Sequence, residues 1–152
     1  MVENSQTVLR LEQFLPYRLF VIASRISSSL ARHYEKTFNI TRPEWRVLAV
    51  LAETPNLSAL EVGERTAMDK VAVSRAISKL VGEKYLKRDM VKEDKRRSKL
   101  CLTEKGKRMY KKIVPIAKHY EAHIMQQFSS QEIELLRNML TKLDALELDI
   151  YE

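Results

Sequence analysis

Hydroxyl and cationic side chains recur at helical spacing in the segment 69–80. On a helix, at 100° per residue, apolar residues gather on one side and these polar residues on the other. The polar side carries the candidate DNA-binding residues Lys70, Val71, Ser74, Arg75, Ser78 and Lys79. Arg can bond two acceptors of guanine, Ser can donate or accept, and Val can contact the methyl group of thymine. The pattern suits the floor of the DNA major groove, and the alternative is an ordinary solvated helix face.

A second cationic cluster lies at the tip of a predicted β-hairpin. The segments 86–91 and 98–102 alternate apolar and polar residues, and a polar connection separates them, as is typical of paired strands. The connection carries Asp94, Lys95, Arg96 and Arg97. A helix followed by a hairpin with a cationic tip is the plan of a winged helix, in which the tip reaches phosphates or a minor groove.

Capping residues predict where the helices that position these groups begin. Three segments match the capping box, in which a hydroxyl and a carboxylate satisfy each other's backbone N–H groups: 41–44, 58–61 and 129–132. Asp69 is the expected cap of the DNA-reading helix. Because the helices 58–67 and 69–80 are joined by so few residues, they form a predicted helix-turn-helix.

Apolar stripes at both ends of the chain predict long helices that need a partner. One helix is expected over 16–38, another from 103 onward with a kink at Pro115, and a last one from 129 onward. A winged-helix core closes without these stripes, so we expect them to pair with a second copy rather than fold back on their own subunit. The predicted fold is mainly α with a small β-hairpin: a winged helix-turn-helix DNA-binding region over 39–103, with dimerisation helices over 1–38 and 104–152.

Composition favours a nucleic-acid partner. The formal net charge is +7, and the segment 70–112 alone holds 16 Lys and Arg against 5 Asp and Glu. A basic block inside a folded region favours a polyanion, and an anionic membrane surface is the weaker alternative. No apolar run approaches the length of a membrane span, and we expect no membrane contact. One cysteine and no recognisable signal peptide predict the reducing cytoplasm.

The wing and the residues after it resemble the MarR family of bacterial transcriptional regulators. Asp94-Lys95-Arg96 looks like the D-x-R wing motif of that family, and Leu100-Cys101-Leu102-Thr103-Glu104-Lys105-Gly106 like its L-x-L-T-x-x-G motif. The resemblance spans 11–146 and implies a homodimer that binds a palindromic operator on double-stranded DNA and usually represses. It also implies that Asp94 braces Arg96 in the minor groove. A charge-assisted bond would suit that role, and a local salt bridge that only stiffens the turn is the alternative.

The resemblance further implies a small aromatic or phenolic anion as effector, bound in a crevice between the reading helix and the dimerisation helices. The candidate ligand-binding residues, which combine cations with aromatic walls, are Tyr17, Arg18, Trp45, Arg46 and Tyr110. Each has a simpler interpretation, with Trp45 in the core and Arg18 and Arg46 on the surface.

Other chemistry finds less support. His119 and His123 share a helix face and could hold zinc with His33 or Glu121, but a structural zinc site usually needs four ligands. Cys101 is out of phase with its apolar neighbours and is expected to be an inert thiol, with a redox-responsive regulator as the alternative. No phosphate loop, nucleophile elbow or HExxH occurs, so we expect neither an enzyme nor a cofactor. A small hydrolase and a sequence-indifferent architectural DNA binder remain open.

Overall fold

The structure is a computed structural model that describes residues 8–90 and 98–147. The chain divides into two compact units, 1–113 and 114–152, and each is described by itself. The division falls inside a helix. The sequence analysis placed its own boundaries at 38/39 and 103/104, between the DNA-binding region and the expected dimerisation helices. The wing tip, with Asp94, Lys95, Arg96 and Arg97, lies outside the described residues.

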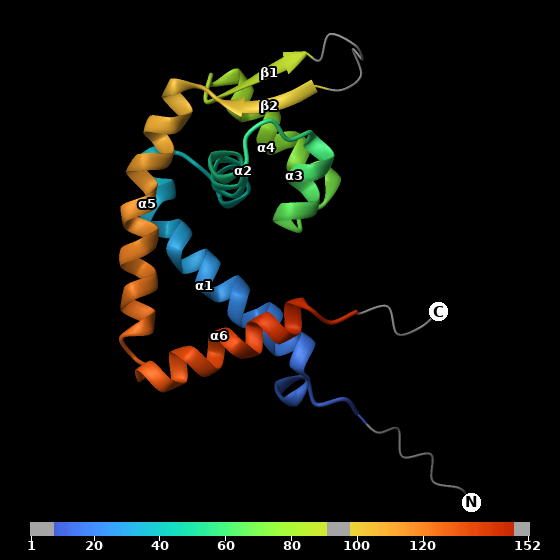
Figure 1. The fold of residues 1–152 in the computed structure, drawn as a ribbon, viewed down its shortest axis with the longest axis vertical. Coiled ribbons are helices and arrows are strands. Elements are labelled where there is room, and N and C mark those ends of the chain that lie inside the picture. Colours follow the sequence, from blue (N-terminus) through green and yellow to red (C-terminus); the bar gives the residue numbers. More distant parts are fainter. Residues whose placement is uncertain (1–7, 91–97, 148–152) are drawn as a thin grey trace, which may run out of the picture. The chain divides into compact units, whose positions relative to one another are not determined.

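The first unit contains most of the secondary structure (Figure 1). A short 3-10 helix precedes four α-helices, an antiparallel hairpin and the beginning of a fifth helix. In order they are η1 (Leu11–Gln13), α1 (Leu15–Phe38), α2 (Arg42–Glu53), α3 (Ala59–Thr66), α4 (Lys70–Gly82), β1 (Leu86–Met90), β2 (Ser98–Leu102) and α5 (Glu104–Met125). The predicted fold class, mainly helical with a small hairpin in a winged helix-turn-helix, is confirmed.

The helix-turn-helix begins and turns where the capping residues predict. The Ser58 hydroxyl accepts from Glu61 N at 3.3 Å, and the Glu61 carboxylate accepts from Ser58 N at 2.7 Å, so α3 starts with a complete capping box. This bonding to Ser58 lowers the pKa of Glu61. Asp69 Oδ1 accepts from Ala72 N at 2.9 Å and caps α4. Between the helices, Ala67 takes the left-handed conformation at φ 50°, which makes the turn tight.

Helix α2 is the centre of the core of the first unit. It packs against α1, α3, α4 and β2, and Figure 1 shows it end-on among them. Its buried side chains Val47, Leu48 and Leu51 meet the buried stripe of α4, which consists of Val73, Ala76, Ile77 and Leu80. Burial of this stripe orients α4 and sends its opposite face outward.

The hairpin is attached to this core at two places. Within the hairpin, Leu86 lies opposite Leu102 in the antiparallel register. The first attachment is the isolated bridge between Leu57, which precedes α3, and Leu100 of β2. The second attachment is at Gly106, which is buried against the backbone of Tyr85. A Cβ there would lie 3.1 Å from the carbonyl carbon of Tyr85 and closer still to its oxygen. Only glycine therefore fits where α5 leaves the hairpin.

The second unit contains the rest of α5 and α6 (Ser130–Asp144). Helix α5 continues through Pro115, and α6 begins at the predicted capping box of Ser129 and Glu132. No residue of α6 is buried, and Leu135, Leu136, Met139 and Leu140 are exposed. Within the described ranges 8–90 and 98–147, no helix is both long and apolar enough to cross a membrane.

Candidate nucleic-acid interface

The outward face of α4 carries the residues that the sequence analysis selected for DNA. Lys70, Val71, Ser74, Arg75 and Ser78 are all exposed, and the Val71 side chain is 57% exposed although it is aliphatic. The face holds two cations, two hydroxyls and one aliphatic group, with no carboxylate from its own helix. Among the residues that the structure describes, neither Lys70 nor Arg75 forms a salt bridge, so this surface can donate to phosphates and to base edges.

Lys79 differs from the other candidates on α4, because it is tied to α2. Its Nζ donates to Glu44 Oε2 at 3.1 Å and to the carbonyl oxygen of Asn39 at 3.4 Å. Glu44 is only 4% exposed and also accepts from Thr41 N at 2.9 Å. The ammonium thus compensates a buried carboxylate and holds the end of α4 against the start of α2.

The base of the hairpin adds exposed cations beside the wing tip. Lys87, Arg88 and Lys99 are exposed on β1 and β2. Lys87 Nζ lies 2.9 Å from Asp89 Oδ2, and the hydrogen bond to this carboxylate raises the pKa of Lys87. Its charge is therefore partly used within the strand, whereas Arg88 and Lys99 extend the positive surface.

A crevice of about 470 Å³ lies between α1, α2 and the start of α4. Arg42 and Arg46 line one wall, exposed Phe20 lines another, and Met68 and the capping residue Asp69 complete it. Arg42 Nη1 donates to Ser28 Oγ at 2.9 Å and is thereby fixed. Two guanidinium groups beside an aromatic ring can bind a small aromatic carboxylate.

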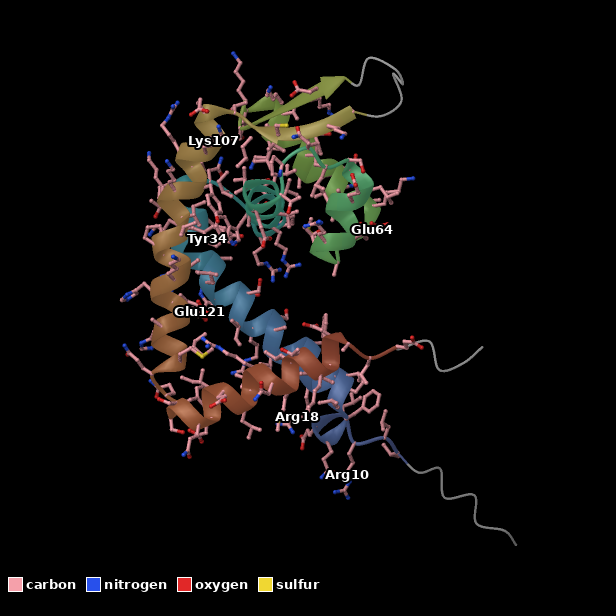
Figure 2. The ribbon with its side chains drawn as sticks, in the orientation of Figure 1. Arg10, Arg18, Tyr34, Glu64, Lys107 and Glu121 are labelled. Carbon is pink, nitrogen blue, oxygen red and sulfur yellow. The ribbon has the colours of Figure 1, made fainter. Side chains whose placement is uncertain are left out.

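The structure does not bring the five predicted ligand-binding residues together. Arg46 lines the crevice, but Tyr17 and Arg18 are exposed elsewhere on α1, as the label of Arg18 in Figure 2 shows. Trp45 stacks on Tyr110, with ring centroids 5.7 Å apart, and packs 5.9 Å from Tyr34. Trp45 is half-buried and belongs to an aromatic cluster.

Sequence reasoning missed Arg42, Phe20 and Met68 as crevice residues. Arg42 could have been found, because it is one helical turn before Arg46 and faces the same way. Phe20 and Met68 carried no signal, since each comes from an element whose packing on α2 is a long-range property of the fold.

Cys101 and the histidines were the residues that the sequence analysis considered for redox chemistry and for zinc. Cys101 is half-buried and donates to Asn56 Oδ1 at 2.7 Å. Among the described residues, no group of three His, Cys, Asp or Glu side chains is placed to hold a metal ion.

Comparison with known proteins supplies the context for this geometry. The sequence profile of the MarR family matches residues 38–97, which run from the end of α1 to the wing. SarZ of Staphylococcus epidermidis, an HTH-type transcriptional regulator, is 26% identical over 126 residues, spanning 82% of this chain and 85% of SarZ. The chain is therefore similar to the MarR family over this segment and to SarZ over most of its length.

Solved structures of MarR proteins have the same fold. A MarR/EmrR-family regulator from Acinetobacter sp. ADP1 is 26% identical, with a TM-score of 0.75 over 91% of this chain and 100% of that one. BpsR of Bordetella bronchiseptica, whose DNA binding is regulated by 6-hydroxynicotinic acid, is 19% identical, with a TM-score of 0.79 over 92% and 99%. The chain thus matches transcriptional regulators both in sequence and in fold.

Proposed function

We propose that the protein is a homodimeric repressor that binds a palindromic operator and leaves it when a small aromatic anion binds. The observation that carries the proposal is the outward face of α4, which offers Lys70, Ser74, Arg75 and Ser78 to solvent over a fully buried stripe. In this proposal Val71 contacts a thymine methyl group, and Lys79 positions α4 instead of contacting a base.

The wing completes the interface with DNA. Arg96 enters the minor groove, Asp94 holds its guanidinium, and Lys95 and Arg97 bind phosphates. Arg88 and Lys99, exposed at the base of the same hairpin, continue this positive surface. Because each neutralised phosphate releases counterions, the logarithm of affinity should fall with the logarithm of salt by about 0.9 per contact.

The dimer uses the exposed apolar side chains near the two ends of the chain. In unit 1 these include Phe14, Leu15 and Leu19 of α1 and its approach, and in unit 2 Leu136 and Leu140 of α6. In each unit, exposed large apolar side chains of this kind are typical of a surface that a partner covers. Two-fold pairing would set two α4 helices about one DNA turn, roughly 34 Å, apart.

The effector site is the crevice lined by Arg42, Arg46 and Phe20. Its proximity to Asp69 gives a route to DNA binding, because a bound carboxylate beside this cap would alter the start of α4. The regulated relative BpsR responds to 6-hydroxynicotinic acid, so an aromatic carboxylate of that size is a suitable first probe.

Selection of DNA from a random pool tests the regulator. We expect a palindromic consensus with half-sites about 10 base pairs apart, and affinity at least about 10³-fold above that for random DNA. Equal affinity for consensus and random DNA would instead indicate an architectural binder.

Titration of the DNA complex with 6-hydroxynicotinate and related aromatic acids tests the effector. The acid should raise the apparent Kd for the operator, and Arg46→Ala should abolish that response while leaving ligand-free binding unchanged. Arg25→Ala, on the exposed side of α1, is the matched control and should respond normally. An Arg46→Ala protein that still responds fully would exclude the crevice.

A further inference from the structure

A second hollow, of about 590 Å³, lies between the C-terminal end of α2, the hairpin and the beginning of α5. All of its lining residues belong to the first unit. It shares no residue with the crevice of Arg42 and Arg46, which α1, α2 and the start of α4 form. Figure 2 labels Lys107, one of its residues, in the first turns of α5 beside the hairpin.

One side of this hollow is positively charged. Lys87 comes from β1, and Lys107 and Lys111 come from successive turns of α5, against the single carboxylate of Asp89. Three ammonium groups and one carboxylate leave a net charge of +2. Within the described part of the chain, Lys111 has no carboxylate at salt-bridge distance, so its charge is available to a ligand.

The two other lysines have partners that a ligand can replace. Lys107 Nζ lies 2.7 Å from Glu104 Oε1, and Lys87 Nζ lies 2.9 Å from Asp89 Oδ2. Both pairs are largely exposed, and exposed pairs contribute little to stability. An incoming carboxylate can therefore share either ammonium without breaking a structural bond.

The rest of the lining is largely apolar. Leu51 and Leu102 are buried, and Ala52, Pro55 and Tyr110 also line the hollow. Tyr110 is held by its stacking on Trp45, so this wall is fixed by the core. A hollow with fixed apolar walls and a few convergent charges has the usual form of a small-molecule site.

We propose that this hollow is a second ligand site, which takes a small organic anion with an apolar body and one carboxylate. The apolar body lies on Leu51, Pro55 and Tyr110, and the carboxylate lies between Lys111 and Lys107. Such a ligand also contacts both strands of the hairpin, since Lys87 of β1 and Cys101 of β2 are paired in the register and both line the hollow.

Cys101 provides a direct readout of occupancy. It lines the hollow, it is half-buried, and it is the only cysteine of the chain. Alkylation by the neutral reagent iodoacetamide, followed by intact mass, therefore reports on this position alone. The probe is 2-naphthoate, and its neutral counterpart 2-naphthamide tests the requirement for charge.

At a 2-naphthoate concentration about ten times Kd, alkylation of Cys101 should slow about tenfold. The same concentration of 2-naphthamide should slow it much less. The double substitution Lys107→Gln with Lys111→Gln should remove the protection by 2-naphthoate. Lys118→Gln, on an exposed α5 lysine outside the hollow, is the matched control and should keep it.

Two outcomes would overturn the proposal. One is an unchanged alkylation rate up to about 10 mM 2-naphthoate, ten times a Kd of 1 mM. The other is protection that Arg46→Ala removes and the double lysine variant keeps, because the probe would then occupy the crevice. Arg46 does not line the hollow, so this test separates the second site from the proposed effector site.

Discussion

Helices α4 and α6 both present a wide exposed face, but the two faces have opposite chemistry. Helix α4 buries Val73, Ile77 and Leu80 and exposes cations and hydroxyls. Helix α6 buries nothing and exposes Leu135, Leu136, Met139 and Leu140. The first helix is therefore stable within its own chain and offers a polar surface to a polyanion. The second remains incomplete until another apolar surface covers it.

The largest effect should come from placing charge on the apolar face of α6. Each leucine buried in a dimer contributes about 1.5–3 kcal/mol. Leu136→Glu with Leu140→Glu should therefore weaken dimerisation at least about a hundredfold, a loss of roughly 3 kcal/mol or more. Sedimentation equilibrium at micromolar protein measures this change. Thr141→Glu, on the same helix, adds a charge without removing an apolar side chain and should remain dimeric.

Substitutions on the polar face of α4 should weaken DNA binding without lowering the stability of the fold. Arg75→Ala should weaken operator binding by about 1–3 kcal/mol and leave the melting temperature unchanged, because the side chain is exposed. Fluorescence anisotropy with the selected operator measures the affinity. Arg137→Ala removes an exposed arginine from α6 and serves as the control. Retained affinity in Arg75→Ala would remove α4 from the interface.

Lys79 is the cation of α4 that we expect to stabilise the fold instead of contacting DNA. Lys79→Met leaves the Glu44 carboxylate without its cation and should destabilise the fold by about 1–2 kcal/mol. Denaturant unfolding measures this loss, whereas operator affinity of the folded protein should change less than in Arg75→Ala. The double variant Lys79→Met with Glu44→Gln should be no less stable than Lys79→Met alone, because the buried charge is then gone. A large loss of affinity at full stability would instead return Lys79 to the DNA-contacting set.

The difference between Arg75 and Lys79 also shows which features of the structure can be predicted from the sequence. Capping residues such as Ser58 and Asp69 act within three positions, so the starts of α3, α4 and α6 and the buried stripe of α4 followed from local spacing. The ion pair of Lys79 joins residues 35 positions apart, and helical spacing alone could not distinguish it from Arg75. The hollow, and Phe20 and Met68 of the crevice, were missed for the same reason, because both sites collect residues from at least three elements.

At neutral pH the smallest effect should come from the ionisation of Tyr34, because it appears only at high pH. Burial of Tyr34, with a further contribution from the charge of Glu35, raises its pKa from 10.0 to about 12. The unfolded chain therefore loses the Tyr34 proton first, and stability that is complete below pH 10 is lost as the pH rises from about 10 to 12. Tyr34→Phe cannot ionise, so its unfolding free energy should fall less steeply over this range in urea titrations. Tyr17→Phe, an exposed ring on the same helix, is the matched control, and an identical slope in all three proteins would mean that Tyr34 is not buried in its neutral form.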